Sequence, residues 1–203
     1  MVERGKSRFI EMFGDPVTNP MGWEVKPYQE CLTHANNGLS RRGVDADGNI
    51  VLRLVELQNG YIDYGNPNRI MLTDEEKGRF LLYDGDVLFA RVNGNPDNVG
   101  RCASFVNIGK SVYHNDHIIR TSLNAEMLCP CYIVHIFNSE YGRSELQDKI
   151  KTSAGQYTVN QVGLGSVRIP LPPLELQNRF AAFVESTDKS KFTIKRGGAC
   201  RTF

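Results

Sequence analysis

The segment Ile169-Pro170-Leu171-Pro172-Pro173 constrains the fold of this chain more than any other part of its sequence. Proline has no backbone N–H, so this segment ends a strand at Pro170 and begins a helix at Pro172-Pro173. Apolar residues then recur at helical spacing and form one stripe, which must be buried. The stripe consists of Leu176, Phe180, Phe183 and Val184. We expect a neighbouring partner helix to cover it.

Short strands separated by turns are predicted for most of the remaining sequence, because apolar runs alternate with stretches rich in Gly, Asn and Pro. The runs that favour strands are residues 50–57, 87–92, 101–106, 116–123 and 166–169. Further helices are indicated at residues 7–13, after the capping-box pattern Thr73-Asp74-Glu75-Glu76, after Pro130 and at residues 142–151. Together these elements predict an α+β fold with a twisted, mostly antiparallel sheet and flanking helices.

Turn signals divide the sequence into four parts. Residues 1–22 contain the end of a helix and a linker, and Trp23 opens a globular domain that extends to residue 171. The last helix is predicted to cover residues 172–192. Residues 193–203 are expected to form an irregular tail, because Gly197-Gly198 breaks a helix.

No motif in the sequence predicts catalysis by this chain. It has no GxxxxGK[ST] phosphate loop, no Gly-x-Ser-x-Gly elbow and no paired CxxC cysteines. The pattern His114-Asn115-Asp116-His117 lies in a predicted strand or loop without a supporting carboxylate cluster, so we do not expect it to bind a metal. We therefore expect a protein that is not an enzyme and holds no cofactor or metal of its own.

Bulk composition does not identify the partner of this chain. Over 203 residues the formal net charge is +1, which neither indicates nor excludes nucleic-acid binding. No apolar run approaches the roughly 20 residues of a membrane span, and the polar N-terminus lacks a signal core, so we expect a cytoplasmic location and no membrane partner. The 5 cysteines are expected to be reduced thiols.

Arginine and amide side chains concentrate in three glycine-containing stretches, residues 36–42, 91–95 and 153–160, which we call the first, second and third polar segments. Arginine suits phosphates and guanine edges, whereas Asn and Gln can form paired hydrogen bonds with adenine. The residues predicted to bind DNA are Arg41, Arg42, Arg91, Asn93, Asn95, Gln156, Tyr157 and Asn160, with the two adjacent arginines at phosphates. The alternative is that all of them are ordinary solvated loop residues.

The sequence from Gly155 to Phe180 resembles the end of a target-recognition domain in the specificity subunits of type I restriction-modification systems. That family shows a Ser-Gly or Ala-Gly turn, then a short helix, then a strand ending in I-P-x-P-P, and then a helix with E-x-Q-x-R-[IF]. The corresponding residues here are Ala154-Gly155, Ile169–Pro173 and Glu175–Phe180. The family usually has Glu directly before Gln, whereas this chain inserts Leu176 between Glu175 and Gln177.

Two further segments carry the same resemblance. Tyr83–Gly94 is similar to a family strand and loop that contains Gly-Asp followed by apolar residues and Arg, and Gly100–Ala103 follows at the usual distance. Ser7–Pro16 with Gly22-Trp23 resembles the junction at which a family helix leads into a recognition domain. The matches occur in order and extend from Ser7 to about residue 192.

The resemblance implies a sequence-specific DNA-binding specificity subunit, which directs methyltransferase and restriction subunits to a target half-site. It implies that residues 1–22 and 172–192 belong to spacer helices, and that the apolar stripe packs on a second such helix. S-adenosylmethionine, ATP and Mg²⁺ would then belong to the partner subunits. Family subunits normally have two recognition domains, so a single domain with an interrupted last helix implies a half-subunit or truncated form.

Two alternatives remain open at this stage. One is a remnant that binds the methyltransferase subunit without reading DNA, and the other is the recognition part of a fused restriction-methylation enzyme. The resemblance also leaves open whether the chain acts with a second recognition domain or associates with itself.

Overall fold

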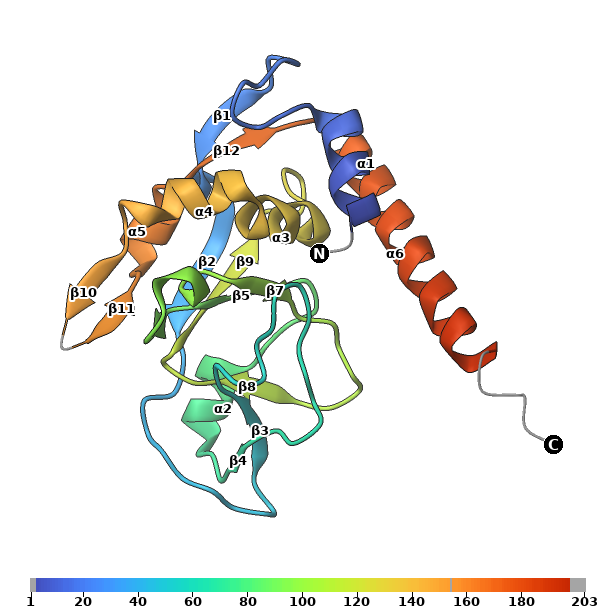
Figure 1. The fold of residues 1–203 in the computed structure, drawn as a ribbon. Helices are drawn as coiled ribbons and strands as arrows, with labels where there is room; N and C mark the ends of the chain where they lie inside the picture. Colours follow the sequence, from blue (N-terminus) through green and yellow to red (C-terminus); the bar gives the residue numbers. More distant parts are fainter. Residues whose placement is uncertain (1–2, 154, 198–203) are drawn as a thin grey trace.

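The α+β fold predicted from the sequence is confirmed in the computed structural model, which describes residues 3–153 and 155–197 (Figure 1). The helices are α1 (Glu3–Phe13), α2 (Asp74–Phe80), α3 (Pro130–Asn138), α4 (Glu140–Gln147), α5 (Gln161–Gly165) and α6 (Leu174–Gly197), with 3-10 turns η1 (Tyr28–Cys31) and η2 (Pro96–Asn98). The strands are β1 (Glu24–Pro27), β2 (Leu32–Asn37), β3 (Asn49–Leu52), β4 (Arg69–Ile70), β5 (Val87–Ala90), β6 (Val92–Asn93), β7 (Cys102–Ser104), β8 (Val112–His114), β9 (Ile118–Leu123), β10 (Lys151–Ser153), β11 (Gln156–Thr158) and β12 (Arg168–Leu171).

The central sheet has the strand order β2-β9-β5-β7, and all of its neighbouring strands are antiparallel. A second sheet, β4-β3-β8, contains the parallel pair β3 and β8. The order β10-β11-β6 forms a third sheet, and β1 pairs with β12 in a two-stranded ribbon. The described strands are therefore mostly antiparallel, as the sequence predicts.

The main core lies between the central sheet and helices α3 and α4, which cover the sheet in Figure 1. Tyr28, Phe89 and Phe137 are all buried, and the ring centroids of Tyr28 and Phe137 are 4.9 Å apart. The hydroxyl of Tyr28 is 2.8 Å from Thr121 Oγ1, so its polar end is hydrogen-bonded inside the core. Contacts among these rings, which come from η1, β5 and α3, fix the position of the sheet against α3.

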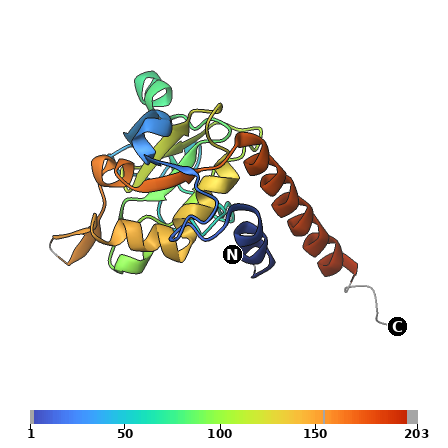
Figure 2. The ribbon, with the colours of Figure 1, turned by 90° about the horizontal axis from the view of Figure 1, so that it is seen from above.

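The two terminal helices pack against each other and against α3. Phe180 of α6 is fully buried, and its ring centroid is 5.4 Å from those of Phe9 and Phe13 in α1. The indole N–H of Trp23 donates to the carbonyl of Phe13 at 2.8 Å, which holds the linker against the end of α1. Beyond the contact of Phe180 with α1, helix α6 runs away from the domain (Figures 1 and 2).

The extent of the last helix corrects the sequence prediction at both ends. The helix begins at Leu174, because the Pro173 carbonyl accepts the N–H groups of Leu176 and Gln177 and so precedes the first turn. It continues to Gly197, so the irregular tail predicted from residue 193 is wrong for residues 193–197. No helix-breaking residue occurs in that stretch before Gly197 itself. The predictions for residues 1–2, Ala154 and 198–203 lie outside the described residues.

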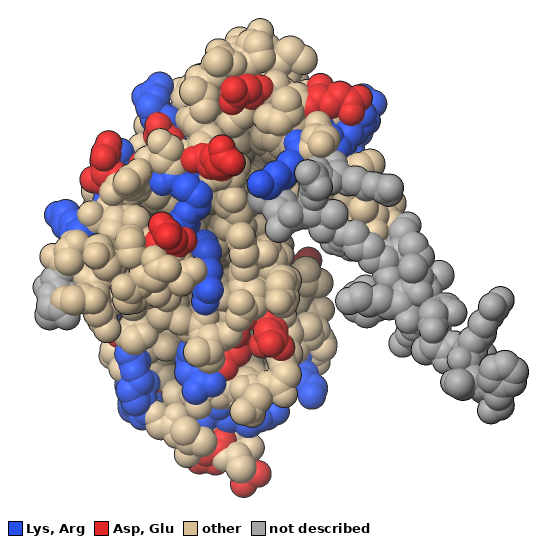
Figure 3. Space-filling model, in the orientation of Figure 1, with Lys and Arg blue, Asp and Glu red and all other residues tan. Residues whose placement is uncertain are grey.

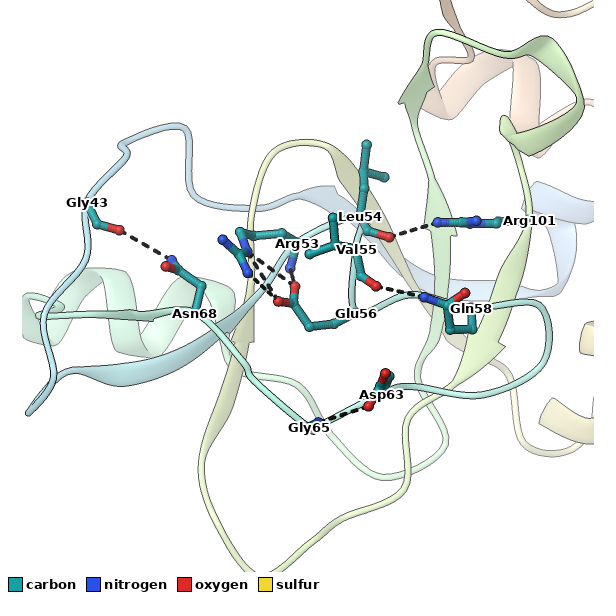
Figure 4. A network of polar contacts seen from close by, with 10 residues as sticks. All are labelled: Gly43, Arg53, Leu54, Val55, Glu56, Gln58, Asp63, Gly65, Asn68 and Arg101. Carbon is teal, nitrogen blue, oxygen red and sulfur yellow. Dashed lines mark hydrogen bonds and ion pairs between the residues drawn. The ribbon is translucent and has the colours of Figure 1, made fainter.

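Several elements are shorter than predicted, and the clearest local reason is found at β3. The strand predicted at residues 50–57 ends at Leu52, because Glu56 folds back onto Arg53 and accepts its N–H at 2.7 Å and its guanidinium at 2.6 Å (Figure 4). Arg101 donates to the Leu54 carbonyl at 2.8 Å and holds this turn against β7. The helix predicted at residues 142–151 spans Glu140–Gln147, and β10 follows it.

The capping box predicted at Thr73 is confirmed at the start of α2. Thr73 Oγ1 accepts the N–H of Glu76 at 3.2 Å, and the Glu76 carboxylate accepts the N–H of Thr73 at 2.9 Å. In the described part of the chain, the helices are too short or too polar to cross a membrane.

Candidate nucleic-acid interface

The second and third polar segments lie side by side in the structure. β6 pairs with β11 in antiparallel register, so that Asn93 is opposite Tyr157. The carbonyl of Arg91, just before β6, accepts the N–H of Val159 at 2.9 Å. With β10, these strands form a sheet that extends from one side of the domain in Figure 1. Two segments that are separate in the sequence therefore form one surface.

The first polar segment joins this surface through a hydrogen bond between two amide side chains. Asn37 is the last residue of β2, and Gln161 is the first residue of α5, directly after the third polar segment. Gln161 Nε2 donates to Asn37 Oδ1 at 3.2 Å. All three polar segments therefore converge in one region of the molecule.

A groove of about 700 Å³ lies where the segments meet. Its lining includes three acidic residues, Glu75, Glu76 and Asp116, together with amides and arginines such as Asn37, Arg79 and Gln161. Of the residues predicted to bind DNA, Arg41 and Arg91 line it. The groove is therefore polar and carries charges of both signs, and it brings the first segment, the arginine before β6 and the start of α5 to one cavity.

The two adjacent arginines of the first segment are both ion-paired. Arg41 lies 2.8 Å from the Glu76 carboxylate and donates to the Met71 carbonyl at 2.7 Å. Arg42 lies 2.8 Å from the Asp116 carboxylate. The hydrogen bond from Arg41 is the main reason why the pKa of Glu76 is lowered from its ordinary value. Each cation is therefore oriented by a carboxylate, and part of its charge is already balanced.

Asp116 connects the first and second segments. Its carboxylate holds Arg42, and its backbone carbonyl accepts a hydrogen bond from Arg91 Nε at 2.7 Å. The guanidinium of Arg42 also lies 3.1 Å from His117 Nε2, a geometry in which the imidazole accepts and is therefore neutral. Partial burial lowers the pKa of His117, which favours the same neutral form. Arg42 and Arg91 are thus both positioned by the turn between β8 and β9, which contains Asp116 and His117.

The predicted asparagines already use their side-chain oxygens in local structure. Asn93 Oδ1 accepts the N–H of Asn95 at 2.9 Å, and Asn95 Oδ1 accepts the N–H of Asp97 at 3.0 Å. Asn160 Oδ1 caps α5 by accepting the N–H of Gly163 at 2.7 Å. A bidentate contact with a base needs both the oxygen and the amide nitrogen, so such a contact by these residues would compete with a turn or a cap.

The remaining predicted residues of the third segment differ in exposure. Gln156 is exposed on β11, whereas Tyr157 is half-buried and packs against the main core. Gly155 has φ +76°, a turn conformation that favours glycine. A Cβ at this position would have no described atom within 4 Å, so the surface beside it is open. Gln156 is therefore the more accessible of the two side chains.

Four amide or arginine residues of the groove were not among the predicted DNA contacts: Asn36 and Asn37, which lie within the first polar segment, and Arg79 and Gln161, which lie outside all three segments. Gln161 lies just outside the third polar segment, and Arg79 belongs to the helix predicted from its capping box. Neither residue stands in a glycine-containing loop, which was the signal used to select candidates.

On the face drawn in Figure 3, charge alone does not mark out a binding surface. Basic and acidic side chains are interspersed on the face drawn in Figure 3, in keeping with the formal net charge of +1. Any attraction for a polyanion therefore depends on where individual arginines are placed and on which of them are already paired.

The histidine pair singled out in the sequence does not form a site of its own. His114 is fully buried, and desolvation together with the charge of Arg120 lowers its pKa to about 3. Its Nδ1 lies 3.2 Å from the Phe80 carbonyl, while His117 points to Arg42. Among the described residues, no group of three or more His, Cys, Asp or Glu side chains is arranged to hold a metal ion.

The apolar stripe of α6 is divided between the core and the surface. Phe180 is buried against α1, so its covering helix is part of this chain. Leu176 and Val184 are half-buried at the edge of the same cluster. Phe183 is half-buried, with the guanidinium of Arg8 5.6 Å from its ring centroid. The inner part of the stripe therefore packs on α1, and its outer part stays partly accessible.

The relatives found by sequence comparison are specificity subunits of type I restriction enzymes. No family model matches the chain. The StySPI specificity subunit of a type I restriction enzyme, from Salmonella potsdam, is 30% identical over 177 residues, which cover 87% of this chain and 38% of that protein. The EcoKI specificity subunit from Escherichia coli K12 is 29% identical over 171 residues, which cover 83% of this chain and 37% of that protein. The chain thus spans less than two fifths of the length of these curated relatives.

Solved structures share the fold at lower sequence identity. A chain from a study of complex assembly and conformational transition in a type I R-M system has a TM-score of 0.61 and 19% identity, covering 97% of this chain and 48% of that one. The HsdS subunit from Thermoanaerobacter tengcongensis has a TM-score of 0.55 and 16% identity, covering 97% of this chain and 45% of that one. The sequence relatives and the shared fold agree with the motifs at both ends of the domain. The chain therefore belongs to the specificity-subunit family of type I restriction enzymes.

Proposed function

We propose that this chain is a target-recognition domain, which binds double-stranded DNA and directs a methyltransferase subunit and a restriction subunit to one half-site. The observation that carries this proposal is the groove that brings together the first polar segment, Arg91 of the second segment and Gln161, which directly follows the third. Hydrogen-bonding side chains on a fixed scaffold are what direct readout of base edges requires. In this proposal the chain supplies sequence recognition only, and catalysis with S-adenosylmethionine, ATP and Mg²⁺ belongs to the other subunits.

Within this proposal, the predicted residues divide into two roles. Arg41 and Arg42 contact phosphates, because a guanidinium held by a carboxylate keeps free N–H groups in a fixed direction. The other predicted residues contact bases or the adjoining backbone; they are Arg91, Asn93, Asn95, Gln156, Tyr157 and Asn160. Arg91 fits this role because Asp116 binds only its Nε.

The outer part of the α6 stripe is proposed to contact a partner helix. Phe183 and Val184 lie next to the packed ring of Phe180, and α6 continues beyond them away from the domain. The partner would be the methyltransferase subunit, a second recognition domain or another copy of this chain.

The experiment that tests the proposed function uses the chain assembled with the methyltransferase subunit of its own system. Binding to a library of randomised DNA duplexes is measured at fixed salt, and the same complex is tested for adenine methylation. Enrichment of one short sequence, matched by methylation at that sequence, is the expected result. Binding without any sequence enrichment would support the alternative of a remnant that contacts the methyltransferase subunit but does not read DNA.

A further inference from the structure

We propose that Gln161 is a base-reading residue, that it recognises adenine, and that Asn37 is the positioning residue that orients it. This inference rests on the proposed function, because it assigns a contact within the same groove. It starts from the hydrogen bond between Gln161 Nε2 and Asn37 Oδ1, at 3.2 Å, in the lining of that groove.

The side chain of Gln161 keeps the groups that adenine needs. Its hydrogen bond to Asn37 uses one of the two N–H groups of the amide, so one N–H and the carbonyl oxygen remain. Within the described part of the chain, that oxygen has no hydrogen-bond partner. One donor beside one acceptor matches N7 and the N6 amino group of adenine in the major groove. The oxygens of Asn93, Asn95 and Asn160, in contrast, each accept a backbone N–H.

The backbone on the Asn37 side is held in place by close packing. Asn37 pairs with Ile119 at the end of β2. At the next residue, Gly38, a Cβ would lie 2.0 Å from the carbonyl oxygen of His114, so only glycine allows the chain to pass this strand. Leu39 N–H then donates to that same carbonyl at 2.9 Å. A side chain on such a scaffold loses little freedom on binding, which favours a defined contact.

The Gln161 side is held by α5 and its packing. Asn160 caps α5, and Leu164 is buried in the main core. At Gly165 a Cβ would lie 3.0 Å from the Gln29 side chain, so α5 packs closely on η1. Both partners of the amide pair are therefore anchored to elements that belong to the core.

Arg79 lies in the same groove as Gln161 but is expected to contact phosphate, so its substitution can be compared with that of the proposed base-reading residue. It lines the same groove and is exposed on α2, and it forms no ion pair among the described residues. Arg41 and Arg42, by comparison, are paired with Glu76 and Asp116. Like Arg41 and Arg42, Arg79 is expected to contact phosphate, which strengthens binding to every sequence alike.

The test compares substitutions in the complex with the methyltransferase subunit, using the randomised duplex library at several salt concentrations. Gln161→Ala is expected to lose about 5- to 150-fold of the preference for adenine at a single position. Gln161→Glu, whose carboxylate only accepts hydrogen bonds, is expected to shift that position toward cytosine. Asn37→Asp keeps an acceptor for Gln161 and should retain the preference for adenine, whereas Asn37→Ala should weaken it.

Two controls complete the design. Gln147→Ala removes an exposed glutamine at the end of α4, outside the groove, and should leave the preference unchanged. Arg79→Ala should weaken binding to all sequences and reduce the slope of log affinity against log salt by about 0.9, without changing the preference. Thermal unfolding of each variant shows whether the fold is retained.

The outcomes separate this inference from the proposed function. If the unmodified complex selects one sequence and both Gln161 variants select it equally well, Gln161 does not read a base and the proposed function stands. A uniform loss of affinity in Gln161→Ala with an unchanged preference would likewise overturn the inference. If the unmodified complex selects no sequence, the proposed function itself fails, and this inference fails with it.

Discussion

The ring of Phe180 in α6 meets the ring of Phe13 in α1 almost perpendicularly, at 75° and with centroids 5.4 Å apart. Phe9 and His135 contact the same ring, with centroids 5.4 Å and 4.7 Å away. One side chain of α6 therefore joins both terminal helices to α3. This places Phe180 in the fold of the chain itself, so it is a poor probe for assembly with other subunits.

Phe180→Ala is expected to destabilise the folded chain by about 3–5 kcal/mol, because it removes a buried ring and leaves a cavity among other rings. The matched control is Phe183→Ala, whose ring is half-buried beside Arg8 and should cost clearly less. Denaturant titration at constant pH measures both changes. Equal midpoints for the two variants would show that α6 is not held through Phe180.

Gly38→Ala is expected to destabilise the chain by at least about 1–3 kcal/mol, since the added methyl would lie 2.0 Å from the His114 carbonyl oxygen and the backbone must move. Gly78→Ala is the matched control. Gly78 lies inside α2, and a Cβ there has nothing within 4 Å, so alanine should stabilise the helix by about 0.5–1 kcal/mol. Opposite signs in thermal unfolding are the expected result, and a neutral Gly38→Ala would contradict the close approach.

The buried imidazole of His114 predicts a specific pH dependence. Its pKa is lowered to about 3 in the folded chain from an ordinary value of 6.5, so between these values the unfolded chain binds the additional proton. The free energy of unfolding should therefore fall as the pH drops from about 6.5 toward about 3. His114→Asn does not titrate, and its amide can donate to the Phe80 carbonyl as Nδ1 does.

The measurement is the difference between the two pH profiles, because carboxylates titrate over part of the same range in both proteins. The fall with acidification should be shallower for His114→Asn than for the unmodified chain. Parallel profiles would mean that His114 is not kept neutral by burial.

A fourth prediction concerns catalysis. The purified chain, incubated with S-adenosylmethionine and duplex DNA, is expected to transfer no methyl group, because the sequence contains no motif for a cofactor loop. Transfer should occur when the methyltransferase subunit is added. Methylation by the chain alone, after removal of any copurified subunit, would contradict its role as a recognition component.

Sequence patterns succeed here where structure is decided by neighbours along the chain. The capping box at Thr73 predicts α2 correctly, because both of its hydrogen bonds join residues three positions apart. The end of β3 was missed, since Glu56 turns back onto Arg53, and an apolar run does not reveal this contact. The amide pair of the groove joins Asn37 to Gln161, which are 124 positions apart. Only the packing of the whole domain brings such residues together, so sequence reasoning identified the polar segments but not their meeting point.

The ribbon formed by β1 and β12 has a consequence for the exchange of this domain between proteins. Glu24 lies opposite Leu171 in that ribbon, so the chain enters the domain and leaves it at the same place. The helices α1 and α6, which precede β1 and follow β12, therefore lie next to each other where they meet the domain. A unit attached in this way can be exchanged for another between two host chains, with only the two crossing points needing to match. Recombination at these two points would replace the domain while leaving the surrounding scaffold unchanged.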